Sequence, residues 1–138
     1  MPADPRAVLA MALEAAVTGD EDIIDAAFTE DVVGWSPNLF VTSRDELAAE
    51  LADRDEALSN VVFSLDALDV IGDKAIAEWR VEADHTGPLS FDDVVMEATG
   101  RHVTLAGATF AEFRGEQICA FRHYFDDAAI IEQMILAD

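Results

Sequence analysis

The segment ICAFRHYFDDAAIIEQM, residues 118–134, places Arg122, His123, Tyr124 and Asp126 between two apolar runs. A carboxylate at the mouth of an apolar cavity loses solvation, which raises its pKa toward the range useful for proton transfer. An arginine on the same face would lower the pKa of that carboxyl group instead. A neighbouring tyrosine could donate a hydrogen bond to a developing enolate oxygen.

Side chains alternate along a strand, so this segment has two different faces. One face is expected to carry Ile118, Ala120, Arg122, Tyr124 and Asp126. The other is expected to carry Cys119, Phe121, His123 and Phe125. On this pattern His123 is a structural residue and Cys119 a small buried hydrophobe. An alternative role for Asp126, or for Asp127 beside it, is to cap the following helix.

The chain is strongly acidic, with 29 Asp and Glu against 8 Lys and Arg among 138 residues, a formal net charge of −21. Such a field repels phosphate backbones and anionic lipids, so we expect neither a nucleic acid nor a membrane as partner. Two explanations of the acidity remain open. It reflects either a GC-rich genome that favours Ala, Asp and Arg, or adaptation to a high-salt cytoplasm. A single cysteine, no secretory signal and no membrane-spanning apolar run favour a cytoplasmic protein.

Capping residues predict three helices in the first part of the chain. Pro5 suits a first helical turn, and Gly19 suits the end of that helix. Asp20 is placed to cap a second, short helix. Ser43 and Glu46 have capping-box spacing at the start of SRDELAAELADRDEAL, the expected third helix. Between the second and third helices, DVVGWSPN is expected to be irregular because it contains a glycine and a proline.

Long alternating segments follow, with turn signals at IGDK and FRGEQ. The expected elements are strands at about 61–71, 74–84, 101–113 and 116–126, and a last helix at about 127–136. Helices and strands that are segregated along the chain indicate an α+β fold. On the 74–84 strand, small residues share a face with Trp79, which would leave space for a ligand there.

Several motifs resemble, in their order and spacing, the SnoaL-like polyketide cyclases of the nuclear-transport-factor-2-like superfamily. They are FTEDVVGWSPN, Trp79 ahead of His85 and Gly87, Thr99-Gly100-Arg101, Gly115-Glu116-Gln117-Ile118, and Asp126 with Gln133. The resemblance covers nearly the whole chain and implies one domain, residues 1–138. Its expected fold is a cone-shaped barrel of a strongly curved antiparallel sheet, with N-terminal helices over one face and a short C-terminal helix.

The resemblance also implies a site. Asp126 would be the acid/base residue of the pocket-lining face, helped by Tyr124 and Arg122, with His85 at the rim. The expected pocket walls are Trp35, Trp79, Phe110 and Glu112. Cyclases of the family can carry a histidine near the position of Glu112, so this departure leaves the cyclase chemistry open. Plain core packing remains the alternative for Tyr124 and the tryptophans, and a solvated loop position remains the alternative for His85.

The absence of certain motifs argues against several kinds of chemistry. The sequence has no phosphate-binding loop, nucleophile elbow or paired-cysteine motif, and its three histidines lack metal-ligand spacing, so we expect no cofactor and no metal. Three functions remain. The first is cofactor-free cyclisation or isomerisation of a small apolar or polyketide-like ligand. The second is an epoxide-hydrolase or dehydratase reaction using Arg122 and Asp126, with Glu112 as second carboxylate. The third is a non-catalytic ligand-binding or assembly module, in which Asp126 contacts only backbone N–H groups.

The face that carries Phe121 and Phe125 is too apolar to meet water. If the Asp126 face lines the cavity, the helices cannot also cover this one. The sequence therefore predicts a homodimer through this face, with Glu78, Arg80 and Glu82 of the neighbouring strand at its rim. The alternative is that a strong twist of the sheet packs this face against the C-terminal helix of the same chain.

Overall fold

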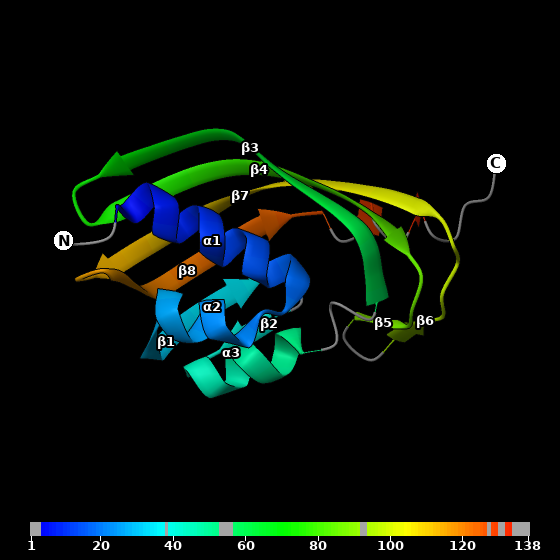
Figure 1. The fold of residues 1–138 in the computed structure, drawn as a ribbon, viewed down its shortest axis with the longest axis horizontal. Coiled ribbons are helices and arrows are strands. Elements are labelled where there is room, and N and C mark those ends of the chain that lie inside the picture. Colours follow the sequence, from blue (N-terminus) through cyan, green and yellow to red (C-terminus); the bar gives the residue numbers. More distant parts are fainter. Residues whose placement is uncertain are drawn as a thin grey trace.

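Three helices cover one end of a curved six-stranded sheet, and a separate two-stranded sheet lies near its other end (Figure 1). The computed structural model describes residues 4–37, 39–52, 57–91, 94–126, 128–129 and 132–133, with the backbone alone at 90, 91 and 94. The helices are α1 (Pro5–Thr18), α2 (Glu21–Ala27) and α3 (Arg44–Leu51). The strands are β1 (Phe28–Ser36), β2 (Leu39–Val41), β3 (Leu58–Ile71), β4 (Lys74–His85), β5 (Leu89–Phe91), β6 (Val94–Met96), β7 (His102–Arg114) and β8 (Gln117–Phe125).

The α+β class is confirmed, but the sheet is neither closed nor wholly antiparallel. Its strand order is β2-β1-β8-β7-β4-β3, with β2 and β3 as the two edges. Strand β1 pairs in parallel with β8, whereas the other neighbouring strands pair antiparallel. The expected barrel is therefore an open, strongly curved mixed sheet. No helix within the described ranges is long and apolar enough to cross a membrane.

The helices begin at the residues that the capping pattern predicted. The Asp20 carboxylate accepts the N–H of Asp22 at 3.0 Å, and Ser43 Oγ accepts the N–H of Glu46 at 3.1 Å. Helix α1 ends at Gly19, whose φ of 74° lies in the left-handed region that favours glycine. Helix α3 ends at Leu51, and residues 53–56 of the predicted third helix lie outside the described ranges.

The prediction of an irregular stretch at DVVGWSPN was wrong, because most of it belongs to strand β1. Gly34 lies inside this strand, paired with Phe121 of β8 and with Val41 of β2. The ring of Phe121 occupies the place where a side chain at residue 34 would be. The glycine therefore marks a close approach between neighbouring strands rather than a break in the chain.

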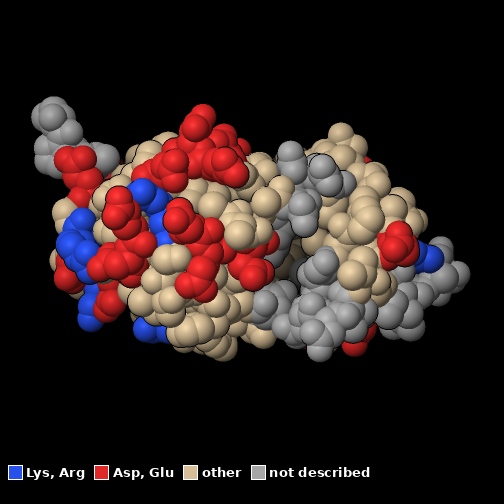
Figure 2. Space-filling view, turned by 90° about the horizontal axis from the view of Figure 1, so that it is seen from below, with Lys and Arg blue, Asp and Glu red and all other residues tan. Residues whose placement is uncertain are grey.

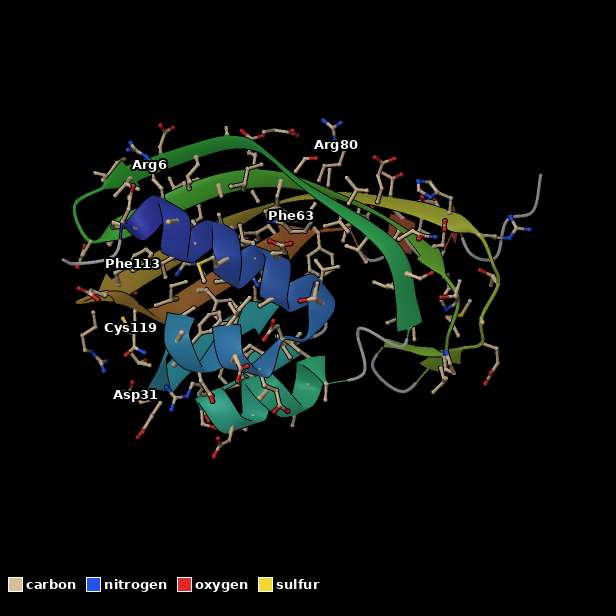
Figure 3. The ribbon with its side chains drawn as sticks, in the orientation of Figure 1. Arg6, Asp31, Phe63, Arg80, Phe113 and Cys119 are labelled. Atoms are coloured by element: carbon tan, nitrogen blue, oxygen red, sulfur yellow. The ribbon has the colours of Figure 1, made fainter. Side chains whose placement is uncertain are left out.

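The concave face of the sheet packs against the helices and forms the core. On β4, the buried alternate residues are those that the sequence placed on the face of Trp79: Ala75, Ala77, Trp79, Val81 and Ala83. The first four join one apolar cluster with side chains from all three helices, and Ala83 joins a smaller cluster with Val103. The inner and outer faces are visible in Figure 3, where Phe63 of β3 lies beneath the sheet and Arg80 of β4 extends from its outer side.

A bulge in β8 changes which of its side chains share a face. Phe113 pairs with Ile118 and Glu112 with Ala120, so Cys119 is an extra residue. Ile118 therefore lies on the concave side with Phe121. The sequence had grouped it with Arg122 and Tyr124, which follow the bulge and lie on the other face. Cys119 itself is half-buried.

Strand β3 has two similar irregularities. Its register against β4 shifts between Ser59 and Val62 and again between Leu65 and Ala67. Each shift adds one residue to β3, and Asp66 lies within the second. Asn60, in the first shift, has a φ of 51°. These bulges increase the local twist of the strand.

The predicted C-terminal helix at 127–136 lies largely outside the described residues; 128–129 and 132–133 are helical. Gln133 holds this segment to β7. Its amide nitrogen donates to the carbonyl oxygen of Thr104 at 2.8 Å, and its amide oxygen accepts the N–H of Thr104 at 2.7 Å. Thr104 lies beyond the last residue pair between β7 and β8, so β8 does not reach its backbone. The Gln133 side chain supplies the partners for its N–H and C=O groups instead.

Candidate functional site

An apolar cavity of about 120 Å³ lies between the concave face of the sheet and the helices. Its described walls are mostly aliphatic and aromatic side chains from α1, α3 and strands of the main sheet. Ser36 and His123 also line it, and His123 is the titratable residue among the described lining. Apolar cavities with few polar groups are typical of small-molecule sites.

His123 belongs to a chain of hydrogen bonds across three strands. The indole Nε1 of Trp79 on β4 donates to Thr109 Oγ1 on β7 at 2.9 Å. Thr109 is fully buried, and its hydroxyl lies 2.7 Å from Nδ1 of His123 on β8. The imidazole ring also packs on Phe121, with 4.6 Å between the ring centroids. The sequence placed His123 on the face away from Asp126, which is correct; its interpretation as a structural residue stays a prediction.

Three of the residues predicted to catalyse lie on the opposite, outer face of β8 or directly after that strand. Arg122 and Tyr124 are exposed; Arg122 Nε donates to the Tyr124 hydroxyl at 3.1 Å, and the guanidinium lies 5.4 Å from the ring centroid of Phe110. Asp126 is also exposed, and its carboxylate accepts the N–H of Ala128 at 3.0 Å. The expectation that this face lines the pocket was wrong, because β8 turns its phenylalanine side toward the helices. A catalytic role for these three residues stays a prediction, but they could not act on a molecule bound inside this cavity.

Of the four predicted pocket walls, only Trp79 lines the cavity. Trp35 is 39% exposed on the outer face, where it packs on Tyr124 with 5.4 Å between ring centroids. Phe110 is 38% exposed on the same side. Glu112 lies 3.8 Å from the Lys74 ammonium group in a solvent-accessible ion pair. The structure therefore does not bring these three together with Trp79.

His85 is buried at the end of β4 rather than exposed in a loop. Its Nδ1 accepts the backbone N–H of Thr99 at 3.3 Å, so a neutral ring carries its hydrogen on Nε2. That Nε2 is buried and has no hydrogen-bond partner within the described structure. His85 pairs in register with Leu58, which lines the cavity, as does Ala83 on the same strand. It therefore lies just beyond one end of the cavity.

Charged pairs occupy the outer surface. His102 lies 3.0 Å from the Asp84 carboxylate and 3.2 Å from the Glu82 carboxylate. Hydrogen bonds to Asp84 and then to Glu82 raise the pKa of His102 above its usual 6.5. Asn60 and His102 together lower the pKa of Asp84. Within the described ranges, no group of three or more His, Cys, Asp or Glu residues is arranged to hold a metal ion.

Phe121 and Phe125 do not form the outer surface that the sequence predicted for a dimer. Both line the cavity, and Phe121 is only 4% exposed. Phe125 packs on Trp79, with 6.2 Å between the ring centroids. The helices of the same chain therefore cover this face. Assembly into a dimer stays a prediction, and the outer face is now the surface available for it.

The acidic residues gather visibly over the helical end of the molecule (Figure 2). The exposed carboxylates there include Glu21, Asp22, Asp45, Glu46 and Glu50. Their closeness makes this surface one of high negative potential.

Comparisons with known proteins agree with this architecture. The family model of the SnoaL-like polyketide cyclases matches residues 6–134. The chain belongs to this family. No curated protein sequence matches this SnoaL-like chain.

Solved structures share the fold at low sequence identity. A candidate polyketide cyclase from Acidithiobacillus ferrooxidans is 16% identical with a TM-score of 0.81, covering 97% of this chain and 96% of its own. TsrD from Streptomyces laurentii is 17% identical with a TM-score of 0.80, covering 96% and 95%. A LEH-like epoxide hydrolase from M. tuberculosis is 15% identical with a TM-score of 0.68, covering 94% and 87%. At these identities the likeness concerns the fold of this SnoaL-like protein and not its reaction.

Proposed function

We propose that this SnoaL-like protein is a cofactor-independent cyclase or isomerase that acts on a small apolar carbonyl compound inside its cavity. The observation that carries the proposal is His123, a titratable ring in the wall of an otherwise apolar cavity. Exchange of a proton next to a carbonyl group needs a base, here solvent water or hydroxide, that takes the proton from carbon, and a side chain that stabilises the charge developing on the oxygen; solvent then returns a deuteron to the carbon. Such a side chain acts more strongly in an apolar cavity, where water does not compete.

The cavity volume limits the size of the molecule. An engineered apolar cavity of about 150 Å³ binds benzene, and the cavity here is about 120 Å³. It is therefore no larger than a site for about one six-membered ring. A longer polyketide-like chain would have to extend beyond the walls that the structure describes.

A non-catalytic ligand-binding module is the second candidate. It is favoured by Asp126, whose carboxylate accepts the backbone N–H of Ala128 and lies outside the cavity. The same observation weighs against the proposed hydrolase chemistry, which needs Arg122 and Asp126 to position a water molecule together. On the outer face, Arg122 contacts Tyr124 and Phe110 instead.

Hydrogen–deuterium exchange at the methyl group of acetophenone tests the proposal. This probe has one aromatic ring, one carbonyl group and protons that exchange through an enol. We expect the protein in D₂O to accelerate the loss of the methyl signal in NMR spectra, His123→Phe to remove the acceleration, and Asp126→Asn to keep it. Exchange that depends on Asp126 and not on His123 would overturn the assignment. Binding without accelerated exchange would favour the non-catalytic module.

A further inference from the structure

His85 ends the row of inward-facing side chains on β4. Trp79, Val81 and Ala83 alternate along the concave face and line the cavity, and His85 is the next member of their row. It is fully buried, and its register partner on β3 is Leu58, another residue of the cavity wall. Paired residues of neighbouring strands point to the same side of a sheet. The imidazole ring therefore lies in the interior, at the end of the cavity where β4 ends.

Thr99 determines which nitrogen of this ring carries the hydrogen. Its backbone N–H lies 3.3 Å from Nδ1 of His85 and can only donate, so Nδ1 accepts. The Thr99 hydroxyl lies 3.0 Å from the same nitrogen. This hydroxyl accepts the backbone N–H of Arg101 at 3.3 Å and has its own hydrogen to direct at Nδ1. The hydrogen of the His85 ring is therefore on Nε2, and a second hydrogen could be added to Nδ1 only by breaking the contacts with Thr99.

The Nε2–H group of His85 is a buried donor without an acceptor. No hydrogen-bond partner for this atom exists among the residues that the structure describes. Nε2 is the ring nitrogen farther from the backbone, so it extends from β4 into the concave side. Buried donors in native proteins nearly always have a partner, because an unpaired one has lost its hydrogen bond to water without replacement. An unpaired donor beside an apolar cavity is suited to an acceptor atom of a bound molecule.

We propose that His85 is a second ligand contact of the cavity, a fixed hydrogen-bond donor that binds a neutral acceptor oxygen, a ketone or an ether, at the far end of the ligand. The proposal rests on the function proposed above, because it assumes that the ligand occupies the same cavity. His85 contributes binding and orientation, and it takes up no proton. A neutral oxygen is favoured over a carboxylate, since a charge would lose its solvation in this apolar place and the net charge of −21 repels anions.

The distance between the two histidines defines the shape of the ligand. His123 is paired across β7 with Ala77 of β4, and residue 85 lies eight residues beyond residue 77 on that strand. At about 3.3 Å per residue, the two rings are therefore placed at opposite ends of the cavity. A molecule that contacts both is longer than the cavity and passes between the side chains of Leu58 and Leu89, which form its wall there. The substrate class is an elongated apolar molecule with an oxygen function toward each end.

The state of the His85 ring is measurable without any ligand. In a long-range ¹H–¹⁵N correlation spectrum of histidine-labelled protein, we expect a protonated Nε2 and an unprotonated Nδ1. The His85→Asn variant identifies the signals of this ring. Its amide oxygen can replace Nδ1 as acceptor for Thr99, whereas no donor remains at the position of Nε2. A hydrogen on Nδ1 in the unmodified protein would overturn the proposal.

Phenyl ketones with a second carbonyl group test the ligand contact. The probes are 1-phenylalkane diones with the second carbonyl on the fifth, seventh or ninth carbon of the chain, each compared with the phenyl ketone that has CH₂ there. We expect at least one dione to bind about fivefold more tightly than its matched ketone and to shift the Hε2 signal of His85 downfield. His85→Asn should remove this advantage. His102→Asn should keep it, because His102 is an exposed histidine at the start of β7.

The outcomes separate this contact from the proposed function. Diones that bind no better than their matched ketones at any spacing would overturn the role of His85, and so would an advantage that persists in His85→Asn. If that variant fails to fold, an unshifted Hε2 signal in unmodified protein saturated with each dione overturns it instead. Acetophenone exchange that is lost in His123→Phe would still support the proposed function in those cases. Failure of every phenyl ketone to bind would overturn both.

Discussion

Gly34→Ala should damage the protein through a single contact. An added Cβ at residue 34 would overlap the ring of Phe121, lying 2.8 Å from its Cε1 atom and closer to two further ring atoms. The ring has little room to move, because it packs on Phe28 at 5.5 Å and on His123 at 4.6 Å between centroids. Overpacking of this kind costs about 3 kcal/mol. Alanine recovers about 1 kcal/mol relative to glycine in a strand interior.

The expected net loss in the free energy of unfolding is therefore about 2 kcal/mol, or about 7 °C in Tm for a domain of this length. Phe121→Leu replaces the ring with a smaller aliphatic side chain and should lower the free energy of unfolding by about 2 kcal/mol by itself. In the double variant the overlap is gone, and only the gain from alanine remains. Its cost should be about 1 kcal/mol rather than the additive 4 kcal/mol, a coupling of about 3 kcal/mol.

Urea unfolding followed by tryptophan fluorescence measures all four proteins of this cycle. The m-values should stay equal, so that shifts in the midpoint report stability alone. Additive costs would refute the reasoning, since they would mean that Gly34 and Phe121 do not meet. A Gly34→Ala variant as stable as the unmodified protein would refute it as well.

Three further outcomes are expected. Because the net charge is −21, Tm should rise between about 0.1 M and 1 M salt, where the Debye length falls from about 10 Å to about 3 Å; a flat curve would argue against adaptation to high salt. The pKa of His102 is raised by Asp84 and Glu82, so its stabilisation is complete below pH 6.5 and is lost as the pH rises through the higher folded-state value. The difference in Tm between the unmodified protein and His102→Gln should accordingly shrink between pH 6 and pH 9, and a constant difference would contradict that pairing. Light scattering should report about twice the 15.0 kDa chain mass, and Phe110→Asp on the outer face should give a monomer; a monomeric unmodified protein would contradict the predicted dimer.

The local signals in the sequence were sufficient for the three N-terminal helices and the long strands. Asp20 and Ser43 cap their helices because short polar side chains at those positions satisfy free backbone N–H groups. Strand β1 was missed because Gly34 was read as a break. In the sheet, Gly34 leaves room for the ring of Phe121, a residue 87 positions away in the chain. No local sequence pattern indicates such a distant contact.

The site was predicted on the wrong face for a different reason. The alternation of Phe121, His123 and Phe125 with charged neighbours by itself favours the phenylalanine side as the buried one. The family resemblance instead implied that the face of Asp126 lines the pocket. His123 was thus identifiable from its shared parity with two buried phenylalanines. The bulge at Cys119, by contrast, depends on the pairing of β7 with β8 and could not be read from either strand alone.

The two bulges in β3 bear on how the protein avoids self-association through its backbone. Strand β3 is an edge of the sheet and is 14 residues long, and within the described residues no other strand pairs along its outer side. An uninterrupted edge of that length is a template onto which another chain can add a strand. The register shifts near Asn60 and Asp66 interrupt the regular row of backbone donors and acceptors, and the Asp66 carboxylate adds charge in the second bulge. Removing both bulges would therefore leave a flatter edge and a protein more prone to form β-aggregates, even with its cavity unchanged.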